Sequence, residues 1–112
     1  MKISFKNHKL TKTFNSKSLL IREYGLKNAR FIMNRMMVLY ASPNLSDVPA
    51  QKPDRCHQLT GDRKGQFSVD IEQPFRLIFK PDQDPLPRKD DGGLDLNRIT
   101  AITILGVEDY HK

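Results

Sequence analysis

A switch to two-residue hydrophobic periodicity, at about residue 67, constrains the fold of this chain more than any other feature. Apolar and polar side chains alternate over residues 67–72, and the alternation returns over residues 75–80 after a short segment that contains Pro74. Successive side chains of a β-strand point to opposite faces, so this pattern is typical of strands with one face on a core. Two such runs around a turn predict a hairpin, although the turn lacks the Asn-Gly pair that favours tight connections.

Two further segments have the character of strands. Residues 2–6 alternate between polar and apolar side chains, as a short half-buried strand does. Residues 99–105 are rich in Ile and Thr, which favour strands. Gly106 follows and is expected to allow a bend before the polar end of the chain.

Helical spacing precedes the strands. Residues 7–14 predict one or two helical turns capped by Asn7, and a longer helix is expected from Leu26 to Ala41, ending before Pro43. The expected apolar stripe of the longer helix consists of Leu26, Ala29, Met33, Met36, Met37 and Tyr40. Its polar residues are expected to lie off that stripe: Lys27, Asn28, Asn34 and Arg35. The methionines are expected to serve as adaptable packing rather than as metal ligands.

The order of these elements predicts one α+β domain over residues 1–112. Its two N-terminal helices are expected to pack on one face of an antiparallel or mixed sheet of about four strands, and the other face is expected to stay open. Residues 42–54 contain three prolines and predict a connecting loop. Residues 81–98 contain five aspartates and predict a long exposed loop.

The net charge of +6 is unevenly distributed. Residues 1–40 contain nine Lys or Arg and one acid, Glu23, whereas residues 81–112 contain four basic and seven acidic residues. A basic surface attracts polyanions by counterion release, so the charge favours either a nucleic-acid partner or a solubilising surface. No apolar run has the length of a membrane span, and residues 1–6 are too polar for a secretory signal. These two features, together with the single cysteine, predict a cytoplasmic protein without a membrane partner.

An acid, a phenol, an imidazole and an amine follow one another from Asp109 to Lys112. Such a segment could be a polar tail that keeps the end of a strand soluble, because chain ends are usually frayed. It could also transfer protons together with His57, if the fold brings the two imidazoles together. His8 lies in a lysine-rich segment and is expected at the surface.

Three cations are candidate phosphate ligands. Arg76 lies on the polar side of the predicted strand, where a guanidinium can bind phosphate through two hydrogen bonds or pair with Asp70 or Glu72 across the hairpin. Arg63 and Lys64 lie between two glycines, but this segment lacks the spacing and the Lys-Ser/Thr pair of a Walker loop. It could still present two charges to a phosphate.

The sequence predicts no metal and no cofactor. Cys56 precedes His57, but adjacent residues rarely bind one ion, and no Cys-x-x-Cys or His-x-x-x-His spacing occurs. As a nucleophile Cys56 would need an activating base and a positive environment, so a structural role is expected for it.

Three motifs together carry a resemblance to a known family: residues 59–69 (LTGDRKGQFSV), 75–79 (FRLIF) and 107–111 (VEDYH). The chain resembles the plasmid-maintenance killer proteins, which are HigB-type toxins of the RelE superfamily. Members of that family have His-x-Leu-(Lys)-Gly-Asp-Arg-Lys-Gly, an aromatic strand, Trp-Arg-Ile-x-Phe and a terminal Asp-Tyr-His. The resemblance spans the chain in element order and is sharpest over residues 57–79 and 106–111.

This resemblance implies a RelE-like fold and a ribosome-dependent endoribonuclease that cuts mRNA in the ribosomal A site without a metal. It implies a helix-turn-helix antitoxin as a partner, which would also hold the complex on operator DNA. The catalytic positions of the family correspond to His57, Arg76, Asp109, Tyr110 and His111. RNA or phosphate contacts are expected from Arg63, Lys64, Lys27 and Arg30.

The residue types suit attack of the RNA 2′-hydroxyl on the adjacent phosphate, which needs a base, an acid and cations. His111 with Asp109 is expected to transfer protons, and His57 to act as second acid/base or as an orienting group. Arg76 would stabilise the phosphate, and Tyr110 would stack on a base or donate a hydrogen bond.

The sequence departs from the family pattern in three places. Thr60 stands where the family has lysine, Phe75 stands where it has tryptophan, and the loop over residues 81–98 is longer. Thr60 keeps open an alternative, a catalytically weakened homologue that binds an antitoxin or the ribosome. A third possibility is a DNA-binding domain that uses the basic residues 1–40.

Overall fold

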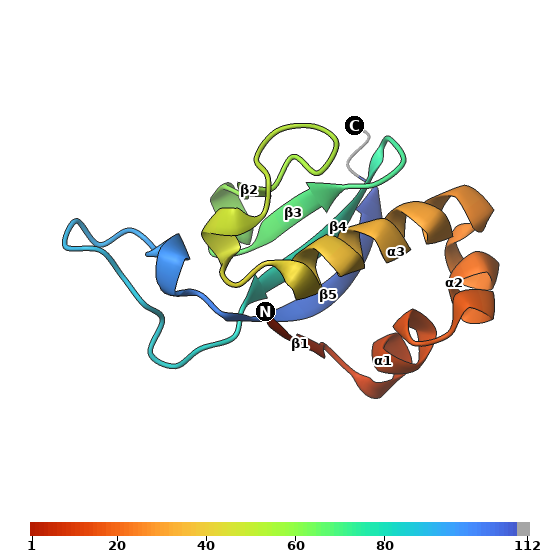
Figure 1. Ribbon diagram of the computed structural model, residues 1–112, viewed down its shortest axis with the longest axis horizontal. Coiled ribbons are helices and arrows are strands. Elements are labelled where there is room, and N and C mark those ends of the chain that lie inside the picture. Colours follow the sequence, from red (N-terminus) through yellow and green to blue (C-terminus); the bar gives the residue numbers. More distant parts are fainter. Residues whose placement is uncertain (110–112) are drawn as a thin grey trace.

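The computed structural model describes residues 1–109 and has helices at its N-terminal end and a mixed sheet behind them (Figure 1). The helices are α1 (His8–Phe14), α2 (Lys17–Tyr24) and α3 (Leu26–Ala41). The strands are β1 (Lys2–Phe5), β2 (His57–Gln58), β3 (Phe67–Asp70), β4 (Phe75–Pro81) and β5 (Ala101–Asp109). They form one sheet in the order β1-β5-β4-β3-β2, in which β1 is parallel to β5 and the other pairs are antiparallel. The predicted α+β class is confirmed, with one helix and one strand more than expected.

Polar side chains define the ends of the first two helices. The Asn7 side chain accepts a hydrogen bond from Leu10 N at 2.9 Å, which confirms the expected N-cap. The Ser16 hydroxyl accepts one from Leu19 N at 3.2 Å and begins α2, a helix that the sequence analysis missed. Gly25, with φ +85°, lies between α2 and α3. Only glycine adopts this backbone conformation readily, so the chain can turn there without a loop.

The bounds of α3 are those that the sequence predicts, but its buried face coincides only in part with the expected apolar stripe. Its buried residues are Asn28, Ala29, Ile32, Arg35, Met36 and Leu39. Three residues of the expected stripe are largely exposed: Leu26 (49%), Met37 (69%) and Tyr40 (50%). The prediction is confirmed for Ala29 and Met36, which are buried, and for Met33, which packs against the core. It was wrong for the three exposed residues and for the buried Asn28 and Arg35, because it assigned all polar residues to the outside. The buried Asn28 Oδ1 accepts a hydrogen bond from Glu72 N at 3.0 Å, so a polar side chain is satisfied inside.

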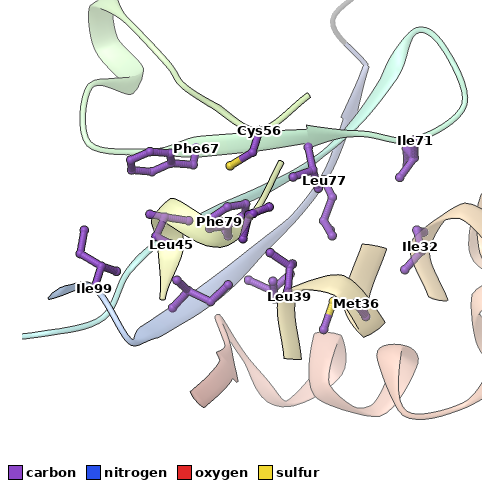
Figure 2. Close-up of a cluster of buried hydrophobic side chains, with 14 of the residues drawn as sticks. Ile32, Met36, Leu39, Leu45, Cys56, Phe67, Ile71, Leu77, Phe79 and Ile99 are labelled. Carbon is purple, nitrogen blue, oxygen red and sulfur yellow. The ribbon is translucent and has the colours of Figure 1, made fainter. Parts of the chain in front are cut away.

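The main core lies between α3 and the sheet. Figure 2 shows Ile32, Met36 and Leu39 of α3 near Leu77 and Phe79 of β4. The Phe67 and Phe79 rings stack with centroids 5.8 Å apart. The connection after α3 also contributes, because its short 3-10 helix η1 (Leu45–Asp47) buries Leu45.

The predicted β3–β4 hairpin is confirmed, with Phe67 opposite Phe79 and Asp70 opposite Arg76. The long loop after β4 projects from the end of the sheet (Figure 1). It contains an isolated bridge between Arg88 and Leu94 and a 3-10 helix, η3 (Leu96–Arg98).

The last strand does not end at residue 105 as expected, because β5 continues to Asp109. Its pairing with β4 shifts by one residue: Ile104 lies opposite Phe79, but Gly106 lies opposite Ile78. This irregularity is a β-bulge, with Gly106 at φ +142°. Gly106 therefore continues the strand with a changed register instead of ending it.

Candidate functional site

The candidate site lies on the sheet face opposite to the helices. Residues that pair directly on adjacent strands have side chains on the same face of the sheet. Leu77 and Phe79 of β4 face the core, so Arg76, which directly precedes Leu77 along the strand, faces away from it. The residues paired with Arg76 face away from the core as well. One row on this face consists of Asp70, Arg76 and Glu108. The next row consists of His57, Ser68, Ile78 and Gly106.

A cavity of about 310 Å³ opens on this face, lined by His57, Gln58, Leu59, Thr60, Arg63 and Arg76. The structure thus brings one candidate acid/base and two candidate phosphate ligands together. They come from β2, from the 3-10 helix η2 (Gly61–Arg63) and from β4. A neighbouring hollow, lined by residues from Gln58 to Gly61 and by Lys64, adds a third cation beside it. The cavity thus combines one group that can transfer a proton with cations that can stabilise a phosphate, which are two of the three requirements for phosphodiester cleavage.

His57 is exposed, and its orientation is set by a neighbouring carbonyl. Its Nδ1 lies 3.0 Å from the Arg55 carbonyl oxygen. A carbonyl oxygen only accepts, so Nδ1 carries the proton in this contact. Nε2 of the neutral ring is then the nitrogen that can accept a proton.

Arg76 is paired with Asp70, one of the two partners that the sequence left open. Its Nε lies 3.6 Å from Asp70 Oδ1, and the arginine side chain is 21% exposed. Glu72, the other partner considered, instead pairs with Lys27 at 3.0 Å. Asp70 also lies 3.3 Å from Arg55 Nη1, so two guanidinium groups share one buried carboxylate. The group of three charges keeps a net charge of +1, which favours an anion in the cavity.

Arg63 is held by Glu108 on the same face. Its Nη1 and Nη2 donate to the two Glu108 carboxylate oxygens at 2.8 and 2.5 Å, and its Nε donates to Gln66 Oε1 at 2.9 Å. Such a bidentate ion pair fixes the orientation of the guanidinium at the edge of the cavity. A phosphate that binds Arg63 through both terminal nitrogens must displace Glu108.

The other predicted site residues lie in different places. Lys27 and Arg30 lie on α3 and do not line the cavity. Asp109 lies opposite Phe75, in register with the row that faces the helices, whereas its neighbour Glu108 is in the Arg76 row. Tyr110 and His111 lie outside the described residues. The catalytic roles of these three residues therefore remain predictions.

Sequence reasoning missed three residues of the site as participants: Arg55, Asp70 as a shared acid, and Glu108. The available signals were an arginine two residues before His57 and a glycine that shifts the register of β5. His8 is exposed, as expected.

Cys56 is a poor candidate for a nucleophile. Burial, together with the nearby charge of Asp54, raises the pKa of its thiol to about 12. The thiol is therefore protonated at neutral pH, and the side chain packs in the core (Figure 2).

Within residues 1–109, no group of three or more His, Cys, Asp or Glu side chains is arranged to hold a metal ion. In the same part of the chain, no helix has the length and hydropathy that crossing a membrane would need.

No family model matches the sequence, and no curated protein sequence matches it. The structure is similar to the structure of the YoeB dimer from Staphylococcus aureus, with a TM-score of 0.52 and 16% sequence identity. The similarity covers 100% of this chain and 98% of that chain. At this identity the likeness shows the fold alone, so the chain has a RelE/YoeB-like α+β fold, as the motif resemblance implied.

Proposed function

We propose that the protein is the toxin of a type II toxin–antitoxin system, a HigB-type ribosome-dependent endoribonuclease that cleaves mRNA and inhibits translation. The observation that carries the proposal is the cavity in which His57, Arg63 and Arg76 meet. Arg63 and Arg76 belong to two of the three motifs on which the family resemblance depends, and His57 lies two residues before the first of them. The likeness to YoeB over the whole chain supports a toxin fold.

In the proposed reaction the RNA 2′-hydroxyl attacks the adjacent phosphate, and the bond between phosphorus and the 5′-oxygen breaks. Side chains of the site would take the proton from the 2′-hydroxyl and give one to the leaving 5′-oxygen. His57 Nε2 would accept or donate one proton, because Nδ1 is engaged by the Arg55 carbonyl. Arg76 and Arg63, helped by Lys64, would stabilise the charge that develops on the phosphate. Asp109, Tyr110 and His111 would complete the site from the end of β5, and Lys27 and Arg30 would contact RNA outside the cavity.

The proposed partners follow from this role. A cognate helix-turn-helix antitoxin would neutralise the toxin in the cytoplasm and hold the complex on operator DNA. The substrate would be mRNA on the ribosome, and no cofactor is proposed.

Induced expression of the chain tests the proposal. We expect growth arrest and translation-dependent cleavage of mRNA, both relieved by co-expression of the antitoxin. Arg76→Ala and His111→Ala should abolish the arrest and still fold. Arg98→Ala removes an equal charge from an exposed arginine in the loop after β4 and should remain toxic. Full toxicity of both site variants would show that the site is assigned wrongly.

Removal of residues 110–112 tests the contribution of the chain end separately. We expect a folded chain without toxicity, because the core and the sheet lie within residues 1–109. Equal thermal unfolding with unchanged toxicity would exclude a catalytic role for Tyr110 and His111.

A weakened homologue remains the second candidate, and a specific observation favours it. Thr60, which replaces the family lysine, lines the cavity, and Glu108 engages Arg63 there. One expected cation, the family lysine, is therefore absent, and another, Arg63, is engaged by Glu108. Ribosome binding without any mRNA cleavage would support this alternative, and Thr60→Lys would then be expected to restore cleavage.

A further inference from the structure

Arg55 has an unusual backbone conformation at the edge of the candidate site. Its φ is +46°, and among residues 1–109 it is the one non-glycine residue with positive φ. A side chain makes this conformation costly, so surrounding contacts must hold it. Its backbone N–H donates to the Gln51 carbonyl at 2.9 Å. Its two remaining polar parts, the carbonyl and the guanidinium, turn toward different residues of the site.

The Arg55 carbonyl fixes the ring of His57. It accepts a hydrogen bond from His57 Nδ1 at 3.0 Å, across a separation of two residues. This contact selects the tautomer in which Nε2 is unprotonated. His57 lies on β2, which has only two residues and pairs with β3 through His57 opposite Ser68.

The Arg55 guanidinium reaches Arg76 through Asp70. Arg55 Nη1 lies 3.3 Å from Asp70 Oδ2, and Asp70 Oδ1 lies 3.6 Å from Arg76 Nε. The Asp70 backbone is itself fixed, because its N–H donates to the Asp54 carbonyl at 2.8 Å and its carbonyl accepts from Arg35 Nε at 2.6 Å. Asp70 is only 5% exposed, so its charge requires a cation as a partner.

We propose that Arg55 is a positioning residue that couples His57 to Arg76 for RNA cleavage, a role that rests on the proposed function. Its carbonyl presents His57 Nε2 as the proton acceptor. Its guanidinium shares the Asp70 carboxylate with Arg76, so Arg76 does not balance this buried negative charge by itself. Without Arg55 the carboxylate would keep the Gln73 amide as a donor at 3.3 Å, but its charge would act on Arg76 more strongly and would weaken the attraction of Arg76 for the substrate.

The test compares Arg55→Lys with Arg55→Met. Lysine and methionine are both unbranched, so both carry the same kind of backbone cost at φ +46°, but only lysine keeps a charge for Asp70. In single-turnover cleavage of mRNA on ribosomes, we expect Arg55→Met to lower the rate at saturation by about 100-fold. The apparent Kd for the ribosome should stay within about 3-fold of the wild-type value, and Arg55→Lys should recover most of the rate. Lys52→Met removes an equal charge from the same loop and should retain the wild-type rate.

Nuclear magnetic resonance of the arginine and histidine side chains gives a readout that does not depend on activity. The wild-type chain should show His57 protonated at Nδ1, and Arg55→Met should shift the Arg76 Nε–H signal, whereas Lys52→Met should not. A His57 ring protonated at Nε2 instead, or an Arg76 signal that Arg55→Met leaves unchanged, would overturn the coupling.

The two proposals can fail separately. A wild-type chain that never cleaves mRNA on ribosomes overturns the proposed function. Equal cleavage by the wild-type chain and by Arg55→Met, or equal damage from the Met and Lys variants, overturns only the positioning role.

Discussion

At the scale of single residues, buried polar side chains determine how α3 lies on the sheet. Arg35 is 7% exposed and donates from Nε to the Asp70 carbonyl and from Nη2 to the Pro53 carbonyl. Asn28, one of its neighbours along the same helix face, binds the N–H of Glu72. Hydrophobic periodicity locates the helix but cannot locate this face, because the partners of both residues lie far away in the sequence.

Substitution of Asn28 tests how much such a buried hydrogen bond contributes to stability. We expect Asn28→Ala to lower the free energy of unfolding by about 1–3 kcal/mol, because the Glu72 N–H would lose its acceptor in a partly buried position. Urea denaturation measures the change. Met37→Ala is the matched control on the same helix, and since Met37 is 69% exposed its change should stay within about 0.5 kcal/mol. Similar losses in the two variants would contradict the buried face described for α3.

The reactivity of the Cys56 thiol tests whether this side chain is buried in the core. A pKa of about 12 instead of 9.0 lowers the thiolate fraction at pH 8 by ~1000-fold. We therefore expect iodoacetamide to alkylate the native protein very slowly and the urea-unfolded protein at the rate of an ordinary thiol. Mass spectrometry measures both rates. Rapid alkylation of the native protein would show that Cys56 is exposed or activated.

At the scale of elements, the bulge in β5 decides which residues reach the site. Before the bulge, Ile102 and Ile104 face the core. Simple alternation would continue this row through Gly106 to Glu108 and would bury the carboxylate. The register shift instead places Val107 opposite Leu77 and Glu108 opposite Arg76. The charged residue thereby reaches the cation side of the sheet, where it binds Arg63.

Gly106→Ala tests the bulge. An added Cβ has no atom within 4 Å, so the expected cost comes from the backbone at φ +142° and not from a clash. We expect a loss of about 1–3 kcal/mol in the free energy of unfolding, measured by urea denaturation.

Gly93→Ala is the control for this substitution, since Gly93 has no such φ and its added Cβ would meet only side-chain atoms. It should cost less than about 1 kcal/mol. A Gly106→Ala chain as stable as the wild type would mean that the strand does not need this conformation.

The sequence predicts the parts of the site that depend on local pattern. The alternation over residues 75–80 correctly places Arg76 on the face opposite Leu77 and Phe79. It cannot predict that Arg55 and Asp70 meet, because their contact depends on how a proline-containing loop crosses the edge of β3. For the same reason it cannot predict Glu108 as a partner of Arg63, which requires both the sheet order and the bulge.

At the scale of the whole molecule, two of its groups of cations line separate pockets. One is the cavity of His57, Arg63 and Arg76. The other is on the short helices, where Lys9, Lys12 and Arg22 line a shared surface hollow. In Figure 1 α1 and α2 lie at the right-hand end of the molecule, away from β2. A substrate as large as a ribosome could contact both places, whereas a short RNA in the cavity would not.

The triple variant Lys9→Gln, Lys12→Gln, Arg22→Gln tests this division of roles. If the helix surface contacts RNA phosphates, the slope of log Kobs against log salt for ribosome binding should fall by about 2–3, because each phosphate contact contributes 0.7–0.9. The single-turnover cleavage rate at saturation should not change, since the cavity is intact. The matched control, Arg88→Gln, Lys89→Gln, Arg98→Gln, removes the same charge from the loop after β4 and should leave the slope unaltered. An equal effect of both triple variants would assign the attraction to net charge alone, and no effect of either would make the basic helices a solubilising surface.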